Sequence, residues 1–195
     1  PSCHKAFGEA TAILVGDFLV SLASRLVMGS SFPAEPLLRM TEELMNAYCE
    51  LCSGQQMDLM SGEGRPSLLD IHRKKTGALF GAVFAMAVSA AGNSRELAGI
   101  ARSVGVKFGV CFQLLDDYLD VYGTDQQRGR VGSSDKRKGK NTYFSDMPLE
   151  RAKKELEAAR SELEHAFNVF ETNATRIPAT RDYIELIMSR YEMKQ

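Results

Sequence analysis

The chain has 195 residues, which predicts a single domain, and 44% of them are hydrophobic, enough to bury a core. Charged residues make up 25% of the chain and the formal net charge is −1. This balance excludes a disordered or fibrous chain, and it gives no overall attraction to nucleic acid or to anionic lipid.

Helical periodicity runs through every long segment, and no run of residues alternates as a strand would. The sequence therefore predicts an all-α fold. The expected helices span residues 4–28, 35–53, 67–91, 94–122, 148–171 and 179–193.

The cysteines give no sign of a disulfide framework, since they stand at positions 3, 49, 52 and 111 of a long chain. Cys49 and Cys52 form a C-x-x-C spacing inside an expected helix. There is no second pair and no nearby histidine to complete a zinc site, so a structural role is favoured. A reducing cytoplasm is the simplest location.

Residues 76–92 are almost all apolar and small, and they include the pair Gly77 and Gly81. Seventeen residues are at the short end of what is needed to cross a membrane. Small residues also let helices approach closely inside a soluble bundle. The sequence therefore predicts a fully buried core helix here and no membrane span.

The most informative segment is a row of acids near residue 116. Gln113, Asp116, Asp117 and Asp120 stand at i, i+3, i+4 and i+7, so they form one polar stripe along a helix. The opposite face has core spacing: Val104, Phe108, Cys111, Leu115, Leu119 and Tyr122. Clustered carboxylates repel one another, and they suit Mg²⁺ held together with substrate phosphates. A magnesium–diphosphate site is favoured over a solvated acidic face.

Basic residues flank this stripe in the sequence. His72, Arg73, Lys74 and Lys75 begin the apolar helix, where backbone amides also favour anions. The long loop after Tyr122 carries Arg128, Arg130, Lys136, Arg137, Lys138 and Lys140. No interleaved aromatic platform accompanies these cations. They are therefore expected to neutralise a diphosphate, and no nucleic-acid partner is expected.

The segment from Gly109 to Asp120 resembles the second aspartate-rich motif of trans-prenyl diphosphate synthases, the polyprenyl synthetase family, and it is closest to the short-chain farnesyl and geranylgeranyl types. Four further segments resemble motifs of the family and occur in the family's own order. Five motifs in this order are specific for the family, whereas any one of them alone would not be. They are Pro1–Asp17, Gly54–Leu59, Ile71–Phe80 and Gly139–Tyr143.

The resemblance implies an orthogonal helical bundle of the isoprenoid synthase type and Mg²⁺-dependent, head-to-tail prenyl transfer between an allylic diphosphate and isopentenyl diphosphate. Its implied site residues are of three kinds. Diphosphate would be bound by Lys75, Thr76, Gln113, Arg130 and Lys140, with Lys75, Thr76 and Gln113 also catalytic. The metal would be held by Asp116 and Asp120, with Asp117 supporting, while Asp135 would lie behind the ligands and Asp58 beside the cavity.

The chain also departs from the family pattern. Arg130 stands where a lysine is usual, and Ser133 where a glycine is usual. The first aspartate-rich motif is expected to lie before Pro1, so residues 1–195 are expected to form a single incomplete domain, inactive alone. The resemblance also implies a homodimer, to which residues 7–28 would contribute. A non-catalytic synthase subunit, an anion- or RNA-binding helical module and a terpene cyclase are the alternatives.

Overall fold

The computed structural model describes residues 1–60, 64, 66–124 and 142–174. Within these ranges every regular element is a helix, which confirms the all-α prediction. The elements in chain order are α1 (Cys3–Phe7), α2 (Glu9–Met28), α3 (Ala34–Leu59), α4 (Leu68–His72), the π-helical turn η1 (Arg73–Gly77), α5 (Ala78–Ala90), α6 (Arg95–Tyr122) and α9 (Leu149–Asn173). The helix expected at 179–193 lies outside the described residues.

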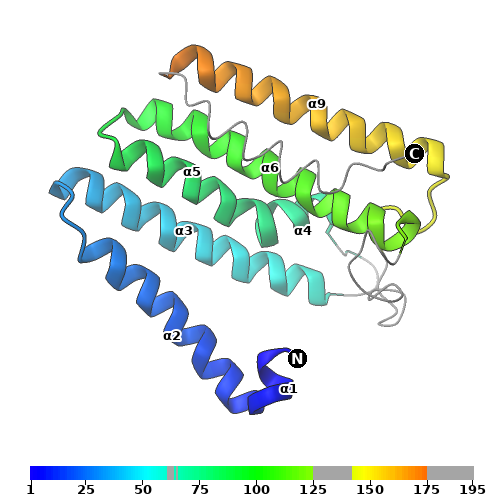
Figure 1. Cartoon of the computed structure of the whole chain (residues 1–195), viewed down its shortest axis with the longest axis horizontal. Coiled ribbons are helices and arrows are strands. Elements are labelled where there is room, and N and C mark those ends of the chain that lie inside the picture. Colours follow the sequence, from blue (N-terminus) through cyan, green and yellow to red (C-terminus); the bar gives the residue numbers. More distant parts are fainter. Residues whose placement is uncertain (61–63, 65, 125–141, 175–195) are drawn as a thin grey trace.

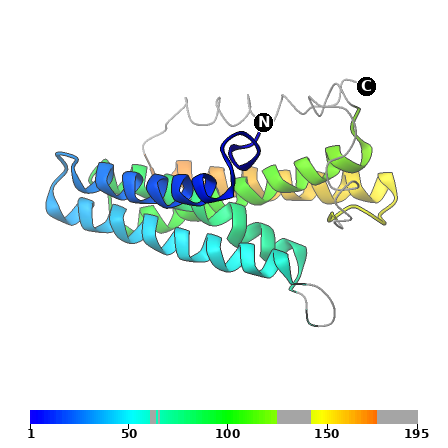
Figure 2. The same ribbon diagram turned by 90° about the horizontal axis from the view of Figure 1, so that it is seen from below.

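Four long helices make up the body of the molecule. Helices α3, α5, α6 and α9 lie side by side in that order, and α2 splays away from the free side of α3 (Figure 1). The view turned by 90° shows α1 folding over the start of α2 (Figure 2). Gly8 joins these two helices with a φ of 86°, a backbone conformation that residues with a Cβ rarely adopt.

Helix α6 lies between α5 and α9, and its apolar face is almost wholly buried there. Of the six residues with core spacing, Tyr122 is partly buried. The other five are buried, as the spacing predicted: Val104, Phe108, Cys111, Leu115 and Leu119. A fully buried side chain of this size contributes about 1.5–3 kcal/mol relative to an exposed one. Burial also raises the pKa of the Cys111 thiol to about 11. This thiol is therefore protonated at neutral pH and is part of the core.

Small residues set the distance between α5 and α6. A Cβ on Gly105 would lie 2.5 Å from the carbonyl oxygen of Phe80, and one on Gly109 would lie 2.7 Å from the Cα of Gly77. The prediction that small residues allow close approach is confirmed. The prediction of a fully buried helix is wrong for one side of α5, because Leu79 and Val83 are 40% and 56% exposed. A run of residues that are almost all apolar does not indicate which side of the helix packs against another helix.

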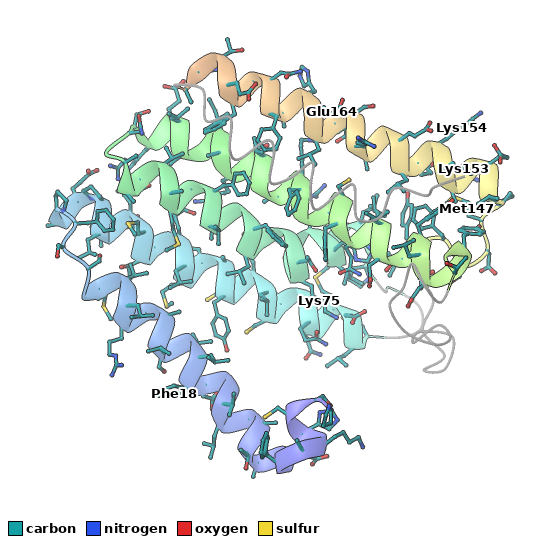
Figure 3. All side chains as sticks on the ribbon, viewed as in Figure 1. Phe18, Lys75, Met147, Lys153, Lys154 and Glu164 are labelled. Carbon is teal, nitrogen blue, oxygen red and sulfur yellow. The ribbon has the colours of Figure 1, made fainter. Side chains whose placement is uncertain are left out.

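Helix α2 presents an apolar surface to the outside. None of its residues is buried, and Phe18 is 61% exposed. Figure 3 labels Phe18 on the part of α2 that lies away from the other long helices. Its other exposed large apolar residues are Ile13, Leu14, Val15, Leu19, Leu26 and Met28. A patch of this kind marks a surface that binds another molecule or segment.

Two of the described helices, α2 and α6, are long and apolar enough to cross a membrane by length and composition alone. This is weak evidence, because core helices of soluble proteins meet the same criteria. In α6 the apolar window is 44% buried inside the protein, which fits its place at the centre of the bundle. The segment that composition singled out forms the 13-residue helix α5, too short to span hydrocarbon.

Candidate functional site

The site begins at a distortion in the helix that was predicted as continuous over 67–91. Residues Arg73–Gly77 form a π-helical turn between α4 and α5, and this turn carries Lys75 and Thr76. Such turns are rare inside helices and occur frequently at functional sites. Helix α3 touches the turn at Gly54, where a Cβ would lie 2.4 Å from the backbone nitrogen of Lys75. The two backbones therefore meet with no room for a side chain.

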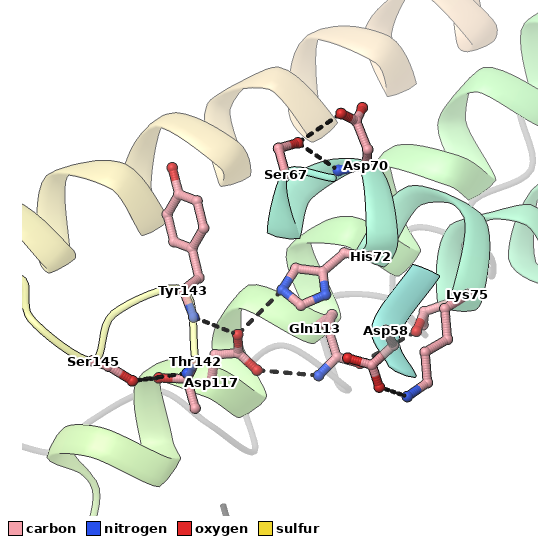
Figure 4. Close-up of polar contacts among 11 residues, drawn as sticks. Asp58, Ser67, Asp70, His72, Lys75, Gln113, Asp117, Thr142, Tyr143 and Ser145 are labelled. Atoms are coloured by element: carbon pink, nitrogen blue, oxygen red, sulfur yellow. Dashed lines mark hydrogen bonds and ion pairs between the residues drawn. The ribbon is translucent and has the colours of Figure 1, made fainter. Parts of the chain in front are cut away.

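Lys75 is held from the α3 side by an ion pair. Its Nζ lies 2.7 Å from Oδ2 of Asp58, a residue near the end of α3 (Figure 4). The Asp58 side chain is 10% exposed and that of Lys75 is 35% exposed. The carboxylate is thus largely taken out of water, while about a third of the Lys75 side chain remains open to solvent. Asp58 and Lys75, which belong to two separate predicted motifs, thus lie in contact.

Thr76 and Gln113 meet across the π-turn and α6. The Thr76 hydroxyl donates to Oε1 of Gln113 at 3.2 Å. The Gln113 amide nitrogen donates in turn to Oδ1 of Asp117 at 3.3 Å, one turn further along α6. Oδ2 of Asp117 lies 3.1 Å from Nε2 of His72 and accepts the backbone N–H of Tyr143 at 2.9 Å. Figure 4 shows this network linking α4, α6 and the segment that leads to α9.

The three acids of α6 differ in their surroundings. Asp117 and Asp120 are 4% and 3% exposed, whereas Asp116 is exposed. The acids therefore do not form a uniform solvated face. A buried carboxylate is costly unless hydrogen bonds or a cation compensate for the lost hydration. Asp117 is compensated by hydrogen bonds from three parts of the chain.

The acids fit a magnesium ion that binds together with a substrate. Among the described residues there is no group of three or more His, Cys, Asp or Glu side chains that could hold a metal ion by itself. Mg²⁺ rarely uses such a cage, since it commonly takes one or two carboxylates together with waters and substrate phosphates. Asp116 and Asp120 stand one turn apart on α6, which is compatible with that use.

Three of the predicted site residues, Arg130, Asp135 and Lys140, lie in 125–141, outside the described residues. Sequence reasoning missed two groups that the structure brings into the site. His72 was noted only as a cation at the start of a helix, and the backbone N–H of Tyr143 carries no side-chain signal. No periodic pattern could pair His72 with Asp117, because they are 45 residues apart.

A separate hollow lies between α4, α6 and α9. Its volume is about 470 Å³, and none of the predicted site residues lines it. Its three cations are engaged: Arg102 pairs with Glu43, Lys107 with Glu162 and Arg73 with Asp70. The Lys107 ammonium group lowers the pKa of the Glu162 carboxyl. The charges around this hollow thus balance one another.

Comparison with known proteins gives a consistent result. A family model described as "Polyprenyl synthetase" matches residues 1–178. The chain is 36% identical to farnesyl diphosphate synthase of Escherichia coli strain K12, over 94% of this chain and 66% of that protein. It is 33% identical to geranylgeranyl pyrophosphate synthase 10, mitochondrial, of Arabidopsis thaliana, over 94% of this chain and 57% of that protein. The chain thus spans less than two thirds of the length of these curated relatives.

A solved structure shows the same fold. The chain is similar to a geranyltransferase from Helicobacter pylori, complexed with magnesium and isoprenyl diphosphate, with a TM-score of 0.75 and 24% identity. The match covers 97% of this chain and 62% of that one. It confirms the predicted isoprenoid synthase type of helical bundle.

Proposed function

Since the chain belongs to the polyprenyl synthetase family, we propose that the complete natural protein transfers prenyl groups head to tail. It would condense an allylic diphosphate with isopentenyl diphosphate into a short-chain, farnesyl- or geranylgeranyl-like diphosphate. One observation supports the proposal: Thr76, next to Lys75 on the π-turn, contacts Gln113, which in turn contacts Asp117 on α6. We also propose a cytoplasmic location.

The residues of this site suit the departure of a diphosphate. In the reaction, the C–O bond of the allylic diphosphate breaks and its electron pair leaves with the diphosphate. The double bond of isopentenyl diphosphate then forms the new C–C bond, and loss of a proton completes the step. Lys75 would stabilise the negative charge that develops on the leaving group, while Thr76 and Gln113 would orient it.

Asp116 and Asp120 are the carboxylates that would hold Mg²⁺ in this site, in keeping with their spacing on α6. When bound, Mg²⁺ supplies positive charge to the diphosphate. Arg130 and Lys140 would add further cations, and Asp135 would support the site from behind. The 195 residues hold one aspartate-rich motif, so we expect the chain alone to be inactive.

We expect Lys75→Met in the complete natural protein to raise the KM for the allylic diphosphate and to lower kcat, with kcat/KM falling about a hundredfold or more. The reason is the loss of a preorganised cation beside the leaving group. Steady-state assays with isopentenyl diphosphate and excess Mg²⁺ measure both constants. Lys154→Met, an exposed position on α9, is the matched control and should stay within twofold.

Unchanged constants for Lys75→Met would remove Lys75 from the diphosphate site. Two other results would contradict the proposed function as a whole. If the unaltered protein transfers no prenyl group alone but raises the activity of a second synthase chain, it is a non-catalytic subunit. If it binds RNA in a salt-dependent way without any prenyl transfer, the binding-module alternative holds.

We further propose that a second copy of the chain covers the exposed apolar side of α2. Phe18→Glu should convert a dimer into a monomer in light-scattering measurements, because a buried, unpaired carboxylate would oppose association. Val169→Glu makes the same change at a half-exposed apolar position on α9 and should leave the dimer intact. A monomeric unaltered protein, or a Phe18→Glu dimer of unchanged affinity, would contradict this proposal.

A further inference from the structure

Asp117 lies at the junction of three parts of the chain. His72 approaches it from α4, Gln113 from the preceding turn of α6, and the backbone N–H of Tyr143 from the segment that leads to α9. The side chains of His72 and Asp117 are only 9% and 6% exposed. This is a buried polar network, in which each partner depends on the others for the hydrogen bonds that replace water.

Both carboxylate oxygens of Asp117 are engaged within the protein. Oδ2 contacts His72 Nε2 and the Tyr143 N–H, and Oδ1 accepts from Gln113. A carboxylate offers about four acceptor positions, so three protein contacts leave little capacity for a metal ion. Asp116, by contrast, is exposed on the same helix. The two adjacent acids are therefore suited to different tasks.

The contact with Asp117 determines which way the Gln113 amide points. With its nitrogen donating to Asp117, its oxygen is the atom that faces the Thr76 hydroxyl. A flipped amide would place its oxygen against the carboxylate, with no proton between the two acceptors. Thr76 and Gln113 are thus held in one arrangement by a group that lies behind them. Preorganisation of this kind improves binding by lowering the entropic cost of ordering the site.

We propose that Asp117 and His72 are positioning residues for the diphosphate site, and that Asp117 acts through Gln113 and does not ligate magnesium. This inference rests on the function proposed above and assigns that site two groups that orient its binding residues. His72 holds the carboxylate, the carboxylate holds the Gln113 amide, and the amide holds the Thr76 hydroxyl. The Tyr143 contact anchors the segment that leads to α9 to the same carboxylate.

A double-mutant cycle in the complete natural protein tests this assignment. Asp117→Asn keeps the shape of the side chain, but its amide group cannot accept from all three donors. We expect it to raise the KM for the allylic diphosphate about tenfold, and to leave the Mg²⁺ concentration for half-maximal rate within twofold. In a Gln113→Ala background the same change should raise this KM less than twofold, because the residue through which Asp117 acts is gone.

Two His72 variants provide an independent test should Asp117→Asn fold poorly. His72→Leu removes the hydrogen-bonding nitrogen and should raise the KM for the allylic diphosphate. His72→Gln retains a donor, so its KM should stay within about threefold of that of the unaltered protein. Circular dichroism checks that each variant is folded. An equal effect of Asp117→Asn with and without Gln113, a tenfold shift in the Mg²⁺ requirement, or equal constants for the two His72 variants would overturn the inference. No prenyl transfer by the unaltered protein would overturn the proposed function first, and this inference with it.

Discussion

We expect Asp116→Ala to lower the turnover of the complete natural protein by a hundredfold or more and to leave its helical content unchanged. Asp116 is exposed on α6, so its removal opens no cavity in the core. The proposed metal site would lose one of its two carboxylates, and with it most of the stabilisation of the leaving diphosphate. Steady-state turnover and far-ultraviolet circular dichroism measure the two effects.

The control for this variant is Glu157→Ala, which removes an exposed acid from α9 without touching the site. Its turnover should match that of the unaltered protein. If Asp116→Ala kept full turnover at every Mg²⁺ concentration, Asp116 would have no part in metal binding. If it lost helical content, the residue would have a structural role that its exposure does not suggest.

The second large effect is expected at Gly54, where α3 meets the π-turn. In Gly54→Ala the new Cβ would lie 2.4 Å from the backbone nitrogen of Lys75 and 2.8 Å from the Cβ of Lys74. Backbone atoms cannot move aside as the end of a side chain can. We therefore expect the free energy of unfolding to fall by about 1–3 kcal/mol, the usual cost of overpacking. Displacement of Lys75 should also lower kcat/KM for the allylic diphosphate.

Gly99→Ala is the matched control, because it lies within helix α6 and nothing would come within 4 Å of its Cβ. Alanine favours a helix interior by about 0.5–1 kcal/mol over glycine, so this control should unfold at a slightly higher urea concentration. Urea unfolding followed by circular dichroism measures both variants. Equal stability of Gly54→Ala and the unaltered protein would mean that α3 and the π-turn are further apart than described.

Much of the fold could be predicted because its helices carry strong patterns. The core spacing of α6 is regular, so its buried face followed directly from the sequence. The π-turn was not predicted. It lies where Lys75 meets α3 and Gly77 meets α6, and a helical pattern does not show such contacts. Periodicity describes the pattern within one helix and not its contacts with neighbouring helices. Residues 67–91 were therefore predicted as one continuous helix.

The sequence named candidate residues for the site but did not show the contacts that connect them. Lys75, Thr76 and Gln113 were named from helical spacing and from the family resemblance. The structure brings Thr76 within hydrogen-bonding distance of Gln113, and Lys75 precedes Thr76 on the π-turn. The resemblance gave Asp117 a supporting role beside Asp116, but the physical basis of that difference was not visible in the sequence. It depends on His72 and on a backbone amide of Tyr143, both far away along the chain.

The central claim is that the α6 acids and Lys75 together bind a magnesium–diphosphate group. Isothermal titration calorimetry of the complete natural protein with inorganic pyrophosphate tests it most directly. We predict saturable binding in the presence of Mg²⁺, which is abolished by EDTA and weakened at least tenfold by Asp116→Ala and by Lys75→Met. Binding of equal affinity in EDTA, or in both variants, would contradict the claim.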